Sequence, residues 1–310
     1  GEFYLALIDE FERNGKLGNR RAYKGSYNSL NSFTGDNLDI CFEDITQGWL
    51  LNYESWLRAK GNKETTISIQ FRTLRSVYNK AIKRKCVGKE YYPFEDFHIN
   101  KFNVHTDKRA ISKNDVLKII SADLTGKSEY VKFSRDIFVF SYLCGGINFC
   151  DVASLTKENI LNGRLSYVRQ KTGKQINLCL TKNASAIIDK YYKGGKGFLF
   201  PILDITRHIT ATQKENRLHK VLGQVDKSLI SKIVISFNDK SLKIVAQIAK
   251  VDVNLTTYVA RHSYATVLKR SGVPTSIICE SLGHSSERMT QIYLDSFENE
   301  QIDEAMKNLL

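Results

Sequence analysis

Apolar side chains recur every three or four positions through most of the first hundred residues, which is the spacing of one face of an α-helix. A turn is indicated at Gly35-Asp36-Asn37, before a short stretch from Leu38 to Phe42 that could be extended. The third helix is expected to end at Gly61, and the fourth to span about Glu64 to Lys85. The four predicted helices carry the apolar stripes Phe3-Leu7-Ile8-Phe11, Tyr23-Tyr27-Leu30-Phe33, Trp49-Leu50-Tyr53-Leu57 and Ile67-Phe71-Leu74-Val77-Tyr78-Ile82.

The helical pattern is interrupted at Pro93, and residues 95–108 show no sustained period, which predicts a linker. Ser112-Lys113-Asn114-Asp115 then has the sequence of a helix N-terminus. Because 310 residues are too many for one compact core, we predict two domains, residues 1–106 with the linker and residues 107–310. Gly1 begins inside a helical pattern without Met, so a segment upstream of residue 1 is also expected.

The second domain is predicted to be mainly helical around one β-hairpin. Phe138–Leu143 reads as a buried helix, and Asp151–Leu155 continues after a break at Gly145-Gly146. Arg164–Leu180 alternates polar and apolar residues around the basic turn Lys171-Thr172-Gly173-Lys174. From Thr181 the pattern is helical again almost to the end. The predicted fold class is therefore mainly α with a small antiparallel β-sheet.

The charge balance favours a polyanionic partner. The chain carries 46 Lys and Arg against 33 Asp and Glu, a net charge of +13. Residues 1–106 hold 16 basic and 13 acidic groups, so most of the surplus lies in the C-terminal part. One face of the fourth predicted helix is nonetheless strongly basic, which indicates either a solvated face or a DNA-binding surface. Its residues are Arg72, Arg75, Lys80, Lys83, Arg84 and Lys85.

The cysteines and the apolar runs exclude several other classes. Six cysteines are scattered without a C-x-x-C pair or a histidine at ligand spacing, so neither a disulfide framework nor a metal site is predicted. No stretch approaches the roughly 18 apolar residues of a membrane helix, and the N-terminus lacks the pattern of a signal peptide. A reducing cytoplasm fits this composition.

Three late stretches contain the residue types that metal-free cleavage of a DNA phosphodiester requires. A reversible reaction needs a hydroxyl nucleophile that forms a covalent phosphate intermediate. It also needs Arg, Lys or His side chains around the non-bridging oxygens, where charge develops. The stretches are Ala260–Thr266, Leu282-Gly283-His284 and Thr290–Tyr293.

These stretches resemble the tyrosine recombinase family, which has an Arg-His pair opening a helix, a Leu-Gly-His and a nucleophilic Tyr. The 23 positions from Arg261 to His284 and the 9 from there to Tyr293 agree with the family. Lys171-Thr172-Gly173 resembles its mobile lysine loop. The helical front part is similar to the core-binding domain of phage and conjugative-transposon integrases, so the resemblance covers nearly the whole chain.

The resemblance implies a role for each residue. Tyr293 attacks the phosphate, giving a 3′-phosphotyrosyl link, while Arg261 and His284 hold the non-bridging oxygens. Lys171 protonates the departing 5′ oxygen. Tyr258 stands where the family usually has His or Lys, and its hydroxyl can still donate to a phosphate oxygen. Lys174 and His262 are expected to contact DNA, and no metal or other cofactor is implied.

One position departs from the family. Residues 146–155 match its G-L-R-x-x-E-L-x-x-L helix, but Asn148 occupies the position of the first catalytic arginine. Some integrases of mobile elements carry an arginine one helical turn earlier, where this chain has Gly145. Asn supplies no positive charge, so another residue would have to reach in. The candidates are Arg169, Arg207, Arg217 and His219, and their spacing does not choose between them. For any single one of them, contact with the DNA backbone is the favoured interpretation.

The predicted function is site-specific DNA recombination, that is, integration, excision or inversion, in a two-domain C-shaped clamp. Its expected partners are double-stranded DNA, three further copies of the chain in a homotetramer on two sites, and an optional DNA-bending protein. Two alternatives are a DNA-binding protein of the same fold that has lost cleavage, and a type IB topoisomerase. An amphipathic segment, Ile302–Leu310, is expected to dock on a neighbouring protomer or to pack on its own domain. The family also implies a bacterial, nucleoid-associated location.

Overall fold

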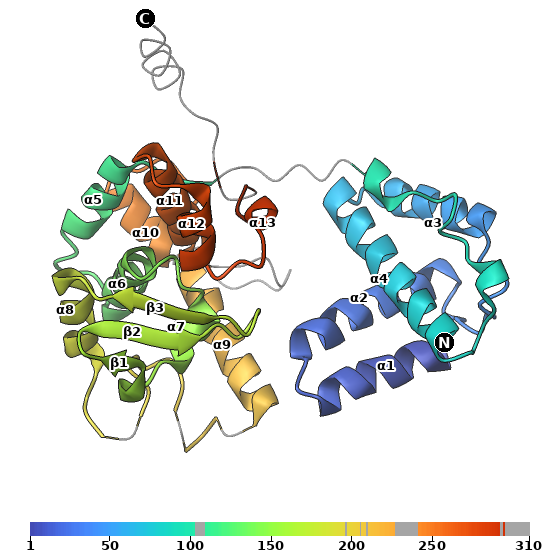
Figure 1. Ribbon diagram of the computed structural model, residues 1–310, viewed down its shortest axis with the longest axis horizontal. Helices are drawn as coiled ribbons and strands as arrows, with labels where there is room; N and C mark the ends of the chain where they lie inside the picture. The colour runs from blue at the N-terminus through green and yellow to red at the C-terminus, as the bar shows by residue number, and fades with distance from the viewer. Residues whose placement is uncertain are drawn as a thin grey trace, which may run out of the picture. The chain divides into compact units, whose positions relative to one another are not determined.

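The computed structural model describes residues 1–102, 109–195, 197–204, 206–208, 210–226, 241–291 and 294, with side chains described only to residue 221 in the 210–226 segment. The chain divides into two compact units, Gly1–Thr106 and Asp107–Leu310 (Figure 1). Helices dominate the described residues, with one three-stranded antiparallel sheet in the second unit, which confirms the predicted fold class. None of the helices in this part of the chain is both long and apolar enough to span a membrane.

The first unit is a small helical domain with an aromatic core. Phe33 packs against Trp49, Tyr53 and Trp56, with ring centroids 5.0–5.5 Å apart. The stretch from Leu38 to Phe42, which could have been extended, is irregular. The four predicted helices are all present, as α1 (Glu2–Arg13), α2 (Leu17–Phe33), α3 (Gln47–Ala59) and α4 (Glu64–Lys83), followed by the short 3-10 turns η1 (Lys89–Tyr91) and η2 (Ile99–Lys101).

The predicted linker is shorter than the sequence pattern indicated. Phe97, Ile99 and Phe102 are all buried in the core of the first unit. The Phe71 ring of α4 lies 4.7 Å from that of Phe97 and 5.4 Å from that of Phe102, measured between centroids. Residues up to 102 therefore belong to this unit, and the prediction of a linker from residue 95 was wrong for them. The remainder of the predicted linker, residues 103–108, lies outside the described residues.

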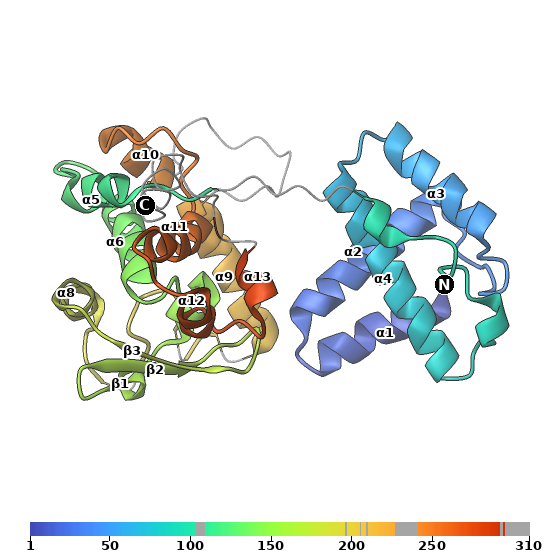
Figure 2. The same ribbon diagram turned by 45° about the horizontal axis from the view of Figure 1, so that its top comes forward.

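The second unit is organised around α6 (Glu129–Leu143), which contacts α5, α8, α9, α10 and α11. Phe138 and Phe140 of this helix are fully buried, as expected of a helix that is covered on most of its faces. Figure 2 shows the sheet along one side of the helical group, with α12 next to β3. The other helices are α5 (Lys113–Ser121), α7 (Phe149–Ser154), α8 (Lys182–Tyr191), α9 (Ala211–Asp226), α10 (Ser241–Ile248), α11 (Thr257–Arg270), α12 (Thr275–Ser281) and α13 (Glu287–Gln291), with the 3-10 turn η3 (Lys157–Asn159).

Local sequence accounts for two of the elements that frame the site. Ser112 caps α5 as predicted, its Oγ accepting from the Asp115 N–H at 3.1 Å. The predicted hairpin is β2 (Arg164–Val168) with β3 (Gln175–Cys179), and the short β1 (Ile160–Leu161) extends it in the order β1-β2-β3. The register pairs Val168 with Gln175, so the basic turn projects beyond the ends of both strands.

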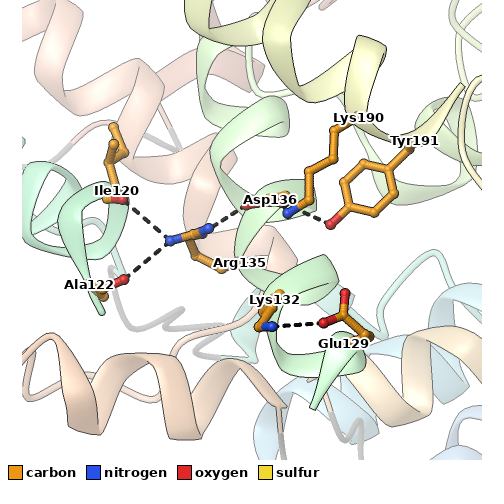
Figure 3. A network of polar contacts seen from close by, with 8 residues as sticks. All are labelled: Ile120, Ala122, Glu129, Lys132, Arg135, Asp136, Lys190 and Tyr191. Atoms are coloured by element: carbon orange, nitrogen blue, oxygen red, sulfur yellow. Dashed lines mark hydrogen bonds and ion pairs between the residues drawn. The ribbon is translucent and has the colours of Figure 1, made fainter. Parts of the chain in front are cut away.

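A buried carboxylate joins three helices of this unit (Figure 3). Asp136 of α6 accepts from Arg135 Nε at 2.8 Å, from Lys190 Nζ at 2.7 Å and from the Tyr191 hydroxyl at 2.8 Å. Arg135 also donates to two carbonyls at the C-terminal end of α5. This network fixes α5 and α8 on α6.

Candidate active site

Arg261, near the start of α11, is the residue on which the candidate site converges. Its side chain is only 2% exposed. Nη1 donates to the Gly146 carbonyl at 2.8 Å, while Nη2 donates to the Leu282 carbonyl at 2.5 Å and lies 3.0 Å from His284 Nε2. A Cβ at Gly146 would lie 2.8 Å from Arg261 Cα, so only glycine allows this approach. Two segments far apart in sequence, at Gly146 and at Leu282-Gly283-His284, are thus held on the guanidinium of a third.

His284 is buried beside Arg261 and is neutral there. An arginine can only donate, so Nε2 accepts and the proton lies on Nδ1, which donates to Thr290 Oγ1 at 3.0 Å. Burial, together with the positive charges of Arg261, Arg169, Lys171 and Lys174, lowers the pKa of His284 from 6.5 to about 3. The imidazole therefore has one fixed tautomer and a lone pair directed at the guanidinium.

The basic turn of the hairpin is tied to the segment that carries His284. The Thr172 hydroxyl donates to the Gly283 carbonyl at 3.2 Å, and the Gln170 N–H donates to Asp151 Oδ1 of α7 at 3.0 Å. Lys171 stands exposed between these two anchors. The flexible turn expected from the sequence is thus hydrogen-bonded to the rest of the site at both ends.

Arg169 is the one of the four candidate cations that contacts this cluster. It is 3% exposed, and its Nη1 donates to the Gly283 carbonyl at 2.9 Å. Arg217 instead donates to the Ile202 carbonyl, Arg207 lies exposed near Asp204, and His219 lies 3.7 Å from Glu215. Spacing alone could not have separated Arg169 from the others, because its position depends on how the hairpin folds back.

The position of the missing arginine is also clear. Asn148 is the half-buried N-cap residue of α7, and its side chain makes no capping hydrogen bond. Gly145, the alternative arginine position, has φ +71°, and a Cβ there would lie 2.7 Å from Leu178 Cδ1. No arginine side chain fits at Gly145 without a shift of its neighbours. Within the described residues, no group of three or more His, Cys, Asp or Glu side chains could hold a metal ion.

Comparison with known proteins decides the class. The family profile of the phage integrases matches residues 109–300, and that of the phage integrase SAM-like domain matches residues 1–102. The chain belongs to the phage integrase family of tyrosine recombinases. This membership confirms the family and the enzyme class predicted from the sequence, a site-specific recombinase.

Individual relatives of the recombinase are distant. Tyrosine recombinase XerD of Halalkalibacterium halodurans is 23% identical over 252 residues, which are 81% of this chain and 77% of the relative. The integrase of Escherichia phage P2 is 20% identical over 270 residues, 87% of this chain and 67% of the relative.

Two solved structures share the fold of the recombinase. The integrase of transposon Tn1549, in complex with a circular intermediate DNA, has a TM-score of 0.61 at 16% identity and covers 99% of this chain and 98% of its own. A lambda integrase dimer bound to a COC′ core site has a TM-score of 0.58 at 14% identity, covering 93% and 97%. At these identities the likeness shows the fold alone.

The remaining predicted site residues of the recombinase are less closely grouped. Tyr258 is 44% exposed and its ring lies 5.0 Å from the buried His262 ring, between centroids. Lys174 is half-buried, and its carbonyl closes the hairpin turn by accepting from the Arg169 N–H at 2.9 Å. Tyr293 and the segment Ile302–Leu310 lie outside the described residues.

The basic face of α4 is partly engaged within its own unit. Arg84 forms an ion pair with Glu10 of α1 at 2.6 Å, and Lys80 Nζ lies 5.9 Å from the centroid of the Phe11 ring. Arg72 and Arg75, earlier on the same helix, are exposed. Lys83 and Lys85, at the end of the helix, are exposed as well. Arg84 and Lys80 are thus the members of the face that contact α1.

Proposed function

We propose that the chain binds double-stranded DNA at a specific site and breaks and rejoins its strands through a covalent 3′-phosphotyrosyl link to Tyr293. The observation that carries the proposal is the convergence of Arg261 and of the hairpin bearing Lys171 on the segment Leu282-Gly283-His284. Membership of the tyrosine recombinase family supports it.

In the first step the Tyr293 oxygen attacks phosphorus and the bond from phosphorus to the 5′ oxygen breaks. The phenol proton passes to water. Arg261, which donates to the neutral His284 ring, also donates to the non-bridging oxygens, where negative charge develops. Lys171 gives a proton to the departing 5′ oxygen, so the strand end leaves as a hydroxyl.

The second step is the reverse, with the 5′-hydroxyl of a partner strand as the attacking group and the Tyr293 phenolate as the leaving group. The bond energy is kept in the phosphotyrosyl link, and neither ATP nor a metal is required. We further propose that four copies act on two DNA sites, with the two units of each copy closing around the duplex. A lambda integrase tetramer bound to a Holliday junction, with a TM-score of 0.56, supports this assembly.

The test is the trapping of the covalent intermediate. The protein is mixed with a pool of nicked duplexes of randomised sequence, in which the cleaved strand end diffuses away, and SDS-resistant adducts are recovered and sequenced. Wild-type protein should form an adduct, and Tyr293→Phe should abolish it. The control is Tyr91→Phe, because Tyr91 is exposed on the other unit and has no part in the proposed chemistry.

The absence of a cation at Asn148 favours a second candidate, a DNA-binding protein of the same fold without cleavage. The two functions differ in one measurement on the same pool of duplexes. Selective, salt-dependent binding without any adduct from wild-type protein would support the second candidate and overturn the first.

A further inference from the structure

The scissile phosphodiester has two non-bridging oxygens, and the proposed reaction assigns them a single arginine, Arg261. Preorganised donors at such oxygens contribute roughly 10²–10³-fold in rate each. Arg261 supplies one guanidinium, and Asn148 leaves the second position uncharged. If the chain cleaves DNA at a useful rate, a second fixed cation must come from elsewhere in the domain.

Arg169 is buried to the same degree as Arg261 and is held in the same way. Arg261 donates to the Leu282 carbonyl and Arg169 donates to that of Gly283, so successive carbonyls of one loop hold the two guanidiniums. A Cβ at Gly283 would lie 3.1 Å from Arg169 Cδ, so the absence of a side chain there leaves room for the arginine. Carbonyl oxygens orient a guanidinium without neutralising it, which leaves its charge available to an anion.

The hydrogen-bonding capacity of Arg169 is largely unused. Within the part of the chain that the structure describes, its buried Nε has no acceptor. Asp151 is the nearby carboxylate, but its Oδ1 accepts from the Gln170 N–H and its buried Oδ2 has no partner either, so the two side chains are not hydrogen-bonded to each other. Burial raises the pKa of Asp151 while the positive charge of Arg169 opposes that rise, so the carboxylate offsets part of the charge but leaves Arg169 Nε without an acceptor.

A purely structural role explains Arg169 poorly. The tie between the hairpin and Gly283 is already made by the Thr172 hydroxyl, which donates to the same carbonyl. The arrangement is instead suited to present a guanidinium next to His284, whose pKa its positive charge helps to lower.

We propose that Arg169 is the second guanidinium that binds the scissile phosphate, in place of the arginine absent at Asn148. The inference rests on the proposed function, since it assigns a further catalytic residue to the same reaction. Arg169 follows the last residue of β2 and Arg261 lies in α11, so the two would contact the phosphate from two different elements.

The experiment compares Arg169→Met with wild type on two versions of one trapped duplex. The first has an ordinary scissile phosphate, and the second has a methylphosphonate, which lacks one negative oxygen. We expect the variant to form adduct about 100-fold more slowly than wild type on the phosphate, and within about threefold of wild type on the neutral methylphosphonate. A side chain that only supports the fold cannot tell the two substrates apart.

Arg164→Met is the matched control, because Arg164 lies on β2, the strand that leads to Arg169, is exposed and donates to Asn177. It should behave as wild type on both substrates. If Arg169→Met fails to fold in a thermal melt, Arg169→Lys keeps the charge but loses the planar fork, and should be slower on the phosphate alone. An equal loss on both substrates, or no loss, overturns the role of Arg169. A wild-type protein that forms no adduct overturns the proposed function instead.

Discussion

The Arg261 guanidinium donates to Nε2 of His284 over 3.0 Å, so the arginine decides which ring nitrogen carries the proton. The same contact places a positive charge beside the imidazole and opposes its protonation. Several consequences of this pair can be measured without knowing the DNA site.

The pH dependence of stability should show the His284 titration. The pKa of His284 is about 3 in the folded protein against an ordinary value of 6.5, which the unfolded chain restores, so the unfolded chain binds the proton more tightly. Below pH 6.5 this difference favours unfolding, and its contribution to the free energy of unfolding falls by up to about 1.4 kcal/mol per pH unit towards pH 3. Denaturant unfolding of wild type and His284→Gln at several pH values measures it.

An anion at the site should raise the pKa of His284. The positive charges of Arg261, Arg169, Lys171 and Lys174 lower the pKa, and a phosphate mimic among them would cancel part of their effect. We expect orthovanadate to shift the ¹⁵N titration of His284 to higher pH. A titration curve that does not move with saturating vanadate would contradict the placement of the phosphate between these side chains.

Thr290 should be needed to hold the imidazole. Its fully buried hydroxyl accepts from His284 Nδ1, and Thr290→Val would leave that N–H without an acceptor at a cost of about 1–3 kcal/mol. The variant should be less stable in denaturant and slower in adduct formation, while Thr290→Ser should retain both. Thr275→Val, at the start of α12, is the control, since Thr275 is only partly buried.

Periodic patterns predicted the long helices and the hairpin because each of them repeats its apolar positions over several turns or alternations. The linker was misplaced since Phe97, Ile99 and Phe102 have no period, and only their packing on Phe71 shows that they belong to the first core. β1 has two residues, too few for any alternation.

The residues of the candidate site also divide into those that local patterns predict and those that only the folded structure brings together. Arg261 and His284 could be found because their neighbours form short motifs at fixed spacing along the chain. Arg169 could not be chosen from among four candidates, since its contact with Gly283 joins residues 114 positions apart. That contact exists only after the hairpin has folded against the loop behind α12, and no local pattern encodes it.

Loss of the Asp136 carboxylate should destabilise the second unit. Asp136→Ala would leave the Lys190 ammonium and the Arg135 guanidinium without their shared partner, and removing one member of a buried ionic network costs about 3–5 kcal/mol. Calorimetry should show a lower melting temperature for the transition of this unit. Glu129→Gln, which removes a solvent-exposed partner of Lys132, should have no measurable effect. An equal shift in both variants would show that the network adds nothing beyond surface charge.

The salt dependence of DNA binding should distinguish Arg72 from Arg84 on the basic face of α4. Each phosphate contact releases counterions, so log K falls with log salt concentration by a slope of about 0.9 for each contact. Arg72→Gln should weaken binding at low salt and reduce the slope by about one. Arg84→Gln should change it less, because Arg84 already pairs with Glu10 over 2.6 Å and would have to give up that partner to reach a phosphate. Fluorescence anisotropy with a labelled duplex over a range of salt concentrations measures both variants. Equal slopes for wild type and Arg72→Gln would place the DNA on another face of this unit.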